Sequence, residues 1–402
     1  MLLAKFLLRL RRHRLRLLAA FLGLVFFVYW VHRVAVGPIG NLVSDVHVEP
    51  IKARAFSVTT PRVGLVILGH DRPEYFRQSF ASVLRARLVE SIDVIVSMDS
   101  KENFASLQSV IDELGGGATV WDSTGGGALR GRTGRDGITF HYKSVLGRLF
   151  DNAYDFGILL ESDLIVSEDF IEYMLGASRL LDPSNPASDG LLCVSGWGSM
   201  SINSLGPNPS RLLRVDKFPG LGWMIHRSMW TSILSQNWAP LANNYNYDVW
   251  LTINNAVEGR ESIVPEVART HHVAKYGTHV NGGEQDWLDW MLLAGPNDRI
   301  SQDEITRVGS VEEYDKRIQA ERILPSKILP MPNSLDTIPY RDSVLIFFDP
   351  EEINTVRSLL NFGGKFVIEF AHKGLFSFTL GSPYGGTNIT FISDPDRSYS
   401  NT

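Results

Sequence analysis

Two carboxylates separated by one residue stand inside an apolar run of the chain. Residues 157–166 read GILLESDLIV, and the two acids are Glu161 and Asp163. Alternate residues of a strand point to the same face of a sheet, so both side chains can address one cation. Two buried like charges otherwise raise each other's pKa values, and hard divalent ions prefer oxygen ligands. The pair predicts a site for Mn²⁺ or Mg²⁺; the alternative is that both acids cap a strand at a solvated edge.

Other acids also follow apolar runs. GLVILG (residues 64–69) precedes Asp71, and DVIVSM (residues 93–98) precedes Asp99. Segments with helical spacing at residues 74–88, 106–114 and 140–154 alternate with these runs and with a third strand signal that ends in TVWD. This alternation predicts a parallel sheet with helices on both faces. Because ligands bind beyond the carboxyl ends of such strands, Asp71, Asp99, Glu161 and Asp163 are expected to converge on one cleft.

The N-terminus differs from the rest of the chain. Residues 1–16 carry six Lys or Arg and no acid, and residues 17–31 are apolar and uncharged. A helix needs roughly 17–25 residues to span a bilayer. We therefore expect a cytosolic basic tail (1–16), a transmembrane signal anchor (17–36) and a stem (37–60), with the remainder across the membrane. A cleaved signal peptide and a mitochondrial presequence are the alternatives.

Composition limits the remaining choices. With one cysteine, Cys193, an intrachain disulfide and a Cys-based zinc site are excluded. A net charge of -5 gives no general reason to expect nucleic-acid binding. The polar stretch after residue 294 and the strand-like runs SVLIFF, GKFVIEF, LFSFTL and TFIS near the end predict a catalytic domain (61–300) followed by a linker and a C-terminal β-rich lobe (301–402).

Several motifs resemble one enzyme family. VIVSMDS, LLESDLIVSEDFIEYM, RVDKFPGLGW, YDVW and PEVARTHHVAKYG are similar, in order and spacing, to segments of glycosyltransferase family 13, the β-1,2-N-acetylglucosaminyltransferase I family. The resemblance runs from about Val63 to Gly283, and FPGLGW is its most specific piece. It implies an α/β GT-A-type fold with a Rossmann-like mixed sheet. It also implies inverting, metal-dependent transfer of GlcNAc from UDP-GlcNAc to the 2-hydroxyl of an α-linked mannose on N-glycans, in the Golgi membrane.

The resemblance also implies roles for single residues. Asp163 matches the family's Mn²⁺ ligand, and Glu161 matches a residue near the nucleotide. Ser162 stands where the family has an acid that contacts the nucleoside. Arg72 and Asp99 match residues of the nucleotide pocket. For these two residues, the alternatives are a helix-start arginine paired with an acid and an aspartate that forms a strand-end turn.

Further matches concern the base and the sugar. Asp248 aligns with the family's catalytic base, although this chain reads YDVW and lacks the family's second acid. Leu221 and Trp223 of FPGLGW are expected beside the sugar, and Thr278 on a loop over the diphosphate. The alternatives are a solvent-exposed Asp248 and a Trp223 that only fills the core. We expect His271 and His272 to have ordinary structural roles.

Two other functions stay open at this point. The chain is also compatible with GlcNAc transfer to O-linked mannose on protein, because acceptor loops are the least constrained part of such folds. It is equally compatible with a non-catalytic, membrane-anchored carbohydrate-binding protein, since Ser162 and Val249 depart from the family pattern.

Overall fold

The structure is a computed structural model of the chain, and it describes most of the residues from 61 onward. The described residues are 61–115, 117–124, 134–198, 201–202, 207–216, 218–238, 246–253, 257, 259–275, 291–323, 325–334, 338, 343–348, 355, 372–373, 375–380 and 387–393. The chain divides into two units, Met1–His47 and Val48–Thr402, and only the second is described below. The predicted tail, anchor and stem lie outside the described residues. Within the described part, no helix is both long and apolar enough to cross a membrane.

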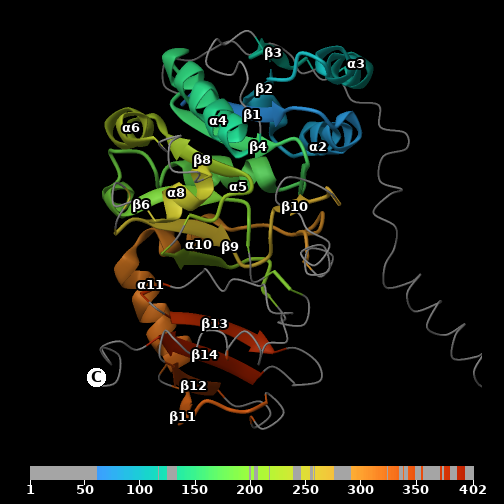
Figure 1. Cartoon of the computed structure of the whole chain (residues 1–402). Helices are drawn as coiled ribbons and strands as arrows, with labels where there is room; N and C mark the ends of the chain where they lie inside the picture. The colour runs from blue at the N-terminus through green and yellow to red at the C-terminus, as the bar shows by residue number, and fades with distance from the viewer. Residues whose placement is uncertain are drawn as a thin grey trace, which may run out of the picture. The chain divides into compact units, whose positions relative to one another are not determined.

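An eight-stranded mixed sheet forms the centre of the described chain (Figure 1). Its first half is parallel, because β1 pairs in parallel with both β2 and β4, and β2 pairs in parallel with β3. In the second half, β8 is antiparallel to both β4 and β6, β6 is parallel to β9, and β7 is antiparallel to β9. The strands in sheet order are β3 (Thr119–Asp122), β2 (Asp93–Met98), β1 (Val63–Gly69), β4 (Phe156–Glu161), β8 (Trp223–His226), β6 (Leu191–Ser195), β9 (Glu261–Pro265) and β7 (Leu212–Val215). The predicted α/β class with a Rossmann-like mixed sheet is confirmed.

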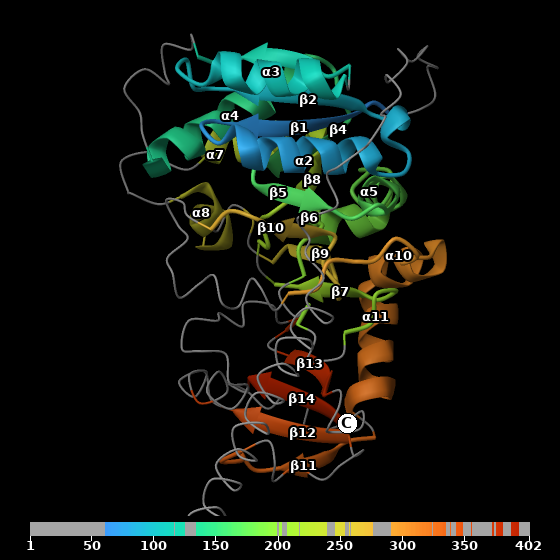
Figure 2. The same ribbon diagram turned by 90° about the vertical axis from the view of Figure 1, so that its right-hand side faces the viewer.

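Helices cover both faces of this sheet (Figure 2). β1 is buried along its whole length, and its side chains alternate between two cores. Leu65 and Ile67 pack on the face covered by α2 (Pro73–Arg85), α3 (Phe104–Leu114) and α5 (Phe170–Ser178). Val66 and Leu68 pack on the opposite face, with α4 (Gly134–Asp151) and α8 (Tyr247–Ile253). The apolar run of β1 is therefore explained by burial on both sides.

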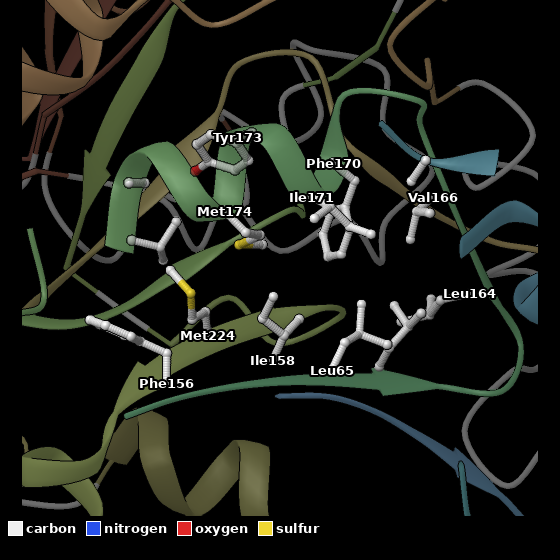
Figure 3. Close-up of a cluster of buried hydrophobic side chains, with 14 of the residues drawn as sticks. Leu65, Phe156, Ile158, Leu164, Val166, Phe170, Ile171, Tyr173, Met174 and Met224 are labelled. Atoms are coloured by element: carbon white, nitrogen blue, oxygen red, sulfur yellow. The ribbon is translucent and has the colours of Figure 1, made fainter. Parts of the chain in front are cut away.

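The contact between α5 and the sheet illustrates this packing. Figure 3 shows Phe170 and Met174 of α5 facing Ile158 of β4 and Met224 of β8 across one apolar layer. All four side chains are fully buried. Such close packing fixes the position of the strand ends relative to the helices. A site at the strand ends depends on that fixed position.

The apolar run of GILLESDLIV predicted one strand, but the structure divides it into two. β4 ends at Glu161, and β5 (Leu164–Val166) belongs to a separate two-stranded sheet with β10 (Thr270–His272). Ser162 and Asp163 occupy the turn between them. The backbone N–H of Ser162 still donates to the Leu68 carbonyl (3.1 Å). The chain then leaves the sheet, and this places the second acid at the sheet edge rather than on its face.

The region after residue 300 contains helices before its strands. α10 (Gln302–Gly309) and α11 (Val311–Ile318) each begin after a serine whose hydroxyl accepts a backbone N–H, a standard N-cap. A π-helical turn (Gln319–Ile323) follows. The mixed four-stranded sheet beyond it has the order β11 (Lys327–Leu329), β12 (Ser343–Phe348), β14 (Thr387–Ser393) and β13 (Leu375–Leu380). The predicted strand GKFVIEF lies outside the described residues, and the predicted domain boundary at residue 300 stays a prediction.

Shorter elements complete the described chain. They are two 3-10 turns (Val89–Ser91 and Pro186–Gly190), α6 (Arg227–Met229), a π-helical turn (Trp230–Leu234) and α7 (Ser235–Asn237).

Candidate functional site

Polar side chains meet at the carboxyl ends of β2, β1 and β4, which are neighbours in the sheet. Asp163, just after β4, is 4% exposed. Its Oδ2 accepts a hydrogen bond from Arg72 Nη2 (2.7 Å) and lies 3.4 Å from His272 Nε2. Arg72 follows β1, and its Nε is 3.3 Å from Asp71 Oδ1. Of the strand-end acids expected to converge, Asp71 and Asp163 are thus linked through Arg72.

The second oxygen of Asp163 is the unusual atom of this site. Oδ1 is buried and has no hydrogen-bond partner among the described residues. Burial opposes ionisation of this carboxyl, but the hydrogen bond with His272 and the charge of Arg72 hold its pKa below the usual range. Asp163 is therefore a buried, charged carboxylate, and one of its oxygens has no partner among the described residues. A buried polar atom left without a partner is costly, which makes it a natural ligand atom for a cation.

His272 is tied to this carboxylate from the other sheet. The register of β10 and β5 puts His272 opposite Leu164, one residue past Asp163. Burial disfavours the imidazolium, yet the hydrogen bond and charge of Asp163 raise the pKa of His272. The backbone N–H of Val273 also donates to the Asp163 carbonyl (2.9 Å). We expected an ordinary structural role for His272, but its side chain directly contacts Asp163, the candidate metal ligand.

Glu161 has different surroundings. Its Oε1 accepts hydrogen bonds from two phenol groups, Tyr142 of α4 (2.9 Å) and Tyr247 of α8 (3.2 Å). Burial, followed by the nearby charge of Asp163, raises the pKa of Glu161 to about 7. Burial and the proximity of Glu161 also raise the pKa of Tyr142, so its hydroxyl stays a donor at neutral pH. Glu161 therefore lies at the wall of the site, and two aromatic hydroxyls hold it in place.

Asp99, at the end of β2, is flanked by two histidines. Its Oδ1 is 2.7 Å from His70 Nδ1, and its Oδ2 is 3.3 Å from His141 Nδ1 on α4. His141 is buried, and its Nε2 is within hydrogen-bond distance of the Ser97 hydroxyl (2.8 Å). Burial works against the charge of Asp99, but the hydrogen bond from His70 and the proximity of His141 lower its pKa. Asp99 is thus an anion held between two histidines and does more than form a turn at the strand end.

Asp248 is the second residue of α8. It is partly exposed, and its Oδ1 accepts the backbone N–H of Val249 (2.8 Å). The preceding residue, Tyr247, bonds Glu161, and the negative charge of Asp248 contributes to the raised pKa values of Glu161 and Tyr142. The structure therefore brings Asp248 to the Glu161 side of the site, on a helix rather than a loop.

The remaining predicted residues have mixed outcomes. Ser162 is buried in the turn between Glu161 and Asp163. Leu221 has a positive φ of 49°, and its carbonyl accepts the Thr270 hydroxyl (2.7 Å), so the FPGLGW turn is fastened next to β10. Trp223 is fully buried within an aromatic cluster, stacked on Tyr142 with a centroid separation of 6.1 Å.

Burial of Trp223 corrects one expectation. A ring with no exposed surface supports the wall of the site and does not present a face to a sugar, so the core role is the observed one. Thr278 lies outside the described residues.

Sequence reasoning did not single out His70, His141 or Tyr142, and it gave His272 only an ordinary structural role. None of them has a local signal, because each is recognised only through a partner on another element. His272, for example, meets a carboxylate 109 positions earlier in the chain (272 minus 163) through strand pairing.

A second cluster with ligand-type atoms lies away from the strand ends. Ligand atoms of Asp216, Glu261 and His372 are within 4.8 Å of one another. However, His372 already bonds Glu261 through Nδ1 and Asp315 through Nε2 (2.6 Å). Lys373 adds an ion pair to Asp315 (2.6 Å). We refer to Asp216, Glu261, Asp315 and His372 as the His372 cluster. Because His372 and Lys373 already pair with Glu261 and Asp315, the cluster is a weaker metal candidate than Asp163.

Comparison with known proteins identifies related sequences. A model of the GNT-I family matches residues 36–291. An Arabidopsis thaliana protein, alpha-1,3-mannosyl-glycoprotein 2-beta-N-acetylglucosaminyltransferase, is 28% identical over 243 residues, which cover 58% of this chain and 52% of the relative. The chain thus spans about half the length of that relative.

Solved structures also resemble the chain, at low similarity. S. aureus TarS 1-349, in a structure described as a complex with UDP-GlcNAc, matches with a TM-score of 0.34 and 11% identity, over 65% of this chain and 73% of that chain. A mycobacterial protein matches with a TM-score of 0.31 and 16% identity, over 51% and 65%.

Proposed function

This chain belongs to the GNT-I family, and from that membership and the geometry of its strand-end site we propose that it transfers GlcNAc from UDP-GlcNAc to the 2-hydroxyl of an α-linked mannose on N-glycans. The observation that carries the proposal is Asp163, a buried, charged carboxylate with one oxygen that has no partner among the described residues; Glu161, two positions earlier, lies near both Asp163 and Asp248. The name of the Arabidopsis relative supports both the sugar and the mannose acceptor. The sheet order β3-β2-β1-β4 with the site at the carboxyl ends supports a GT-A-type arrangement.

The residues present fit a divalent metal ion. Asp163 Oδ1 is free to bind it, while Arg72 and His272 occupy the other oxygen. A carboxylate oxygen is the kind of ligand that Mn²⁺ or Mg²⁺ prefers. Such an ion supplies charge neutralisation for the diphosphate of the donor.

The nucleotide would lie along the ends of β1 and β2. Asp99, held by His70 and His141, presents a fixed acceptor to a uracil or ribose donor group. Arg72, 30% exposed at its side chain, can reach the diphosphate from its place beside Asp163. Glu161 and Ser162 continue this nucleotide wall, and we place Leu221 near the sugar. The contact of Thr278 with the diphosphate stays a prediction.

Asp248 acts as the general base in this proposal. Its carboxylate takes the proton from the mannose 2-hydroxyl as that oxygen forms a bond to the anomeric carbon of GlcNAc. The bond from the anomeric carbon to the diphosphate oxygen breaks at the same time, and UDP leaves with the electron pair. Because attack and departure occur on opposite faces, the product is β-1,2-linked and the anomeric configuration is inverted.

The test is a transfer assay with two variants of the full chain. We expect Asp248→Asn to lower kcat by about 10²–10⁴-fold while UDP affinity changes by less than about twofold. We expect Asp163→Asn to lose Mn²⁺-dependent UDP binding together with activity. Glu113→Gln, which alters an exposed ion pair with Arg77, is the control for general damage.

Three acceptor conditions separate the alternatives: a mannose-terminated N-glycan, an O-mannosyl peptide, and no acceptor. Transfer to the peptide alone would replace the N-glycan proposal with O-mannose modification. UDP-GlcNAc binding without transfer or hydrolysis in any condition would refute the enzyme proposal and leave a carbohydrate-binding protein.

We further propose that residues 17–36 anchor the chain in the Golgi membrane as a single-pass type II protein. The basic residues before this apolar segment support that orientation. Co-localisation with a Golgi marker and resistance to alkaline extraction are the expected results, and release into the soluble fraction would refute the anchor.

A further inference from the structure

Tyr247 occupies a distinctive place, between two residues of the proposed reaction. It is the first residue of α8, and Asp248, the proposed base, is the second. Its hydroxyl donates to Glu161 Oε1 at the end of β4 (3.2 Å). One phenol group thus joins the helix that carries the base to the strand that leads to the metal site.

The Tyr247 ring is held independently of its hydroxyl. It is 4% exposed and stacks on Tyr142 with a centroid separation of 3.9 Å. It also lies nearly parallel to the Trp238 ring (6.2 Å between centroids, 7°). Its backbone N–H donates to the Thr139 hydroxyl on α4 (3.2 Å). Loss of the hydroxyl alone would leave these contacts in place.

Glu161 receives a second phenol that provides an internal comparison. Tyr142 donates to the same Oε1 at 2.9 Å and is as buried as Tyr247. Tyr142, however, belongs to α4, which carries no proposed base. Both hydroxyls donate to Glu161 Oε1, but only Tyr247 belongs to the helix that carries Asp248.

From this arrangement we propose that the Tyr247 hydroxyl is a positioning group: it fixes the start of α8 against Glu161 and so sets the distance from Asp248 to the acceptor hydroxyl. The inference rests on the proposed function, because it takes Asp248 as the base. Asp248 itself has one described side-chain bond, to its neighbouring backbone N–H, which leaves its position dependent on the helix. A small displacement of a reacting group is enough to lower a rate strongly, by about 10²-fold for 1 Å.

The experiment compares Tyr247→Phe with Tyr142→Phe in the full chain. We expect Tyr247→Phe to lower the kcat of transfer by about 10-fold or more, with donor affinity within about twofold of the parent. Tyr142→Phe should lower kcat at least about fivefold less, although it removes the shorter of the two hydrogen bonds. Equal losses in the two variants, or a parallel loss of UDP affinity in Tyr247→Phe, would overturn the inference.

A double-mutant cycle addresses the case in which Tyr247→Phe is poorly folded. If the hydroxyl acts through Glu161, Tyr247→Phe should change kcat by less than about twofold in a Glu161→Ala background. A full, additive loss there would overturn the inference as well.

Failure of the proposed function gives a different pattern. In that case the parent chain itself shows no transfer to the mannose-terminated N-glycan. If transfer occurs but Asp248→Asn retains it, the base assignment fails, whatever the tyrosine variants do. If Asp248→Asn is inactive and the two phenylalanine variants are alike, the base survives and only the positioning role of Tyr247 is refuted.

Discussion

Asp169→Asn tests how much the buried ion pair next to β5 and β10 stabilises the chain. Asp169 Oδ2 accepts from Arg269 Nε (3.1 Å) and lies 3.0 Å from Arg269 Nη2, and the two side chains are 1% and 0% exposed. Asp169 follows β5, and Arg269 directly precedes β10. The pair therefore fastens together the two strands that place Asp163 and His272. The substitution keeps the shape of the side chain and removes its charge.

The expected loss of stability follows from what remains around Arg269. Breaking a buried ion pair by neutralising one partner costs about 3–5 kcal/mol, because the other charge stays buried. Arg269 keeps hydrogen bonds to the carbonyls of Val267 (2.7 Å) and Pro209 (2.6 Å), so we expect the lower end of that range. A domain of 150–250 residues shifts its Tm by about 2–4 °C per kcal/mol. Since this unit is larger, a shift of about 6 °C is expected, near 2 °C per kcal/mol.

Thermal unfolding of the full chain, followed by circular dichroism, measures this shift. The matched control is Glu113→Gln, which breaks a bidentate but exposed ion pair with Arg77 and should leave Tm unchanged within error. A shift in Asp169→Asn no larger than in the control would refute the reasoning. It would mean that the buried guanidinium is stabilised adequately by carbonyl groups alone.

Two further predictions concern stability elsewhere in the chain. Although burial opposes the imidazolium, hydrogen bonds to carboxylates raise the pKa of His372. The stability that the His372 cluster contributes is therefore fully present below the unfolded-state pKa of about 6.5. It is lost as pH rises through the higher folded-state pKa. Tm should therefore fall more between about pH 6 and pH 8 in the parent than in His372→Gln, and equal slopes would count against this assignment. A Cβ on Gly222 (φ 90°) would lie 2.6 Å from a threonine methyl, whereas one on Gly220 (φ 64°) meets no atom nearer than 3.7 Å. In urea titrations, Gly222→Ala should lose about 2–5 kcal/mol and Gly220→Ala about 1–2 kcal/mol, and the reverse order would show that the turn can relax.

The fold of the first half was predictable because its signals are local. Apolar runs and helical spacing place β1 at Val63–Gly69 and α3 at Phe104–Leu114, close to the predicted residues 64–69 and 106–114. The break in GILLESDLIV was not predictable in the same way. β5 leaves the main sheet because it pairs with β10, about one hundred residues later, and such pairing leaves no periodic trace in either segment.

The same distinction applies to the candidate site, because local patterns revealed only some of its residues. Glu161 and Asp163 were found because acids after apolar runs mark strand ends, and parallel neighbours share an edge, whereas Arg72 was found through the family resemblance. Trp223 was assigned to the sugar from its motif, but its burial depends on aromatic partners from α4 and α8 that no local pattern reveals. Residues that act by touching another side chain need the tertiary structure before they can be recognised.

The two acids of the opening motif also show why one strand end can support two roles. Glu161 sits among phenol groups, and burial raises its pKa to about 7, whereas His272 and Arg72 keep the pKa of Asp163 low despite burial. Carboxyl groups whose surroundings separate their pKa values are suited to different tasks. Asp163, charged and with an unpaired oxygen, is suited to a cation, and Glu161, held by hydroxyl donors, is suited to hydrogen bonding. The break between β4 and β5 produces this difference, because it turns the second acid away from the tyrosines and toward β10.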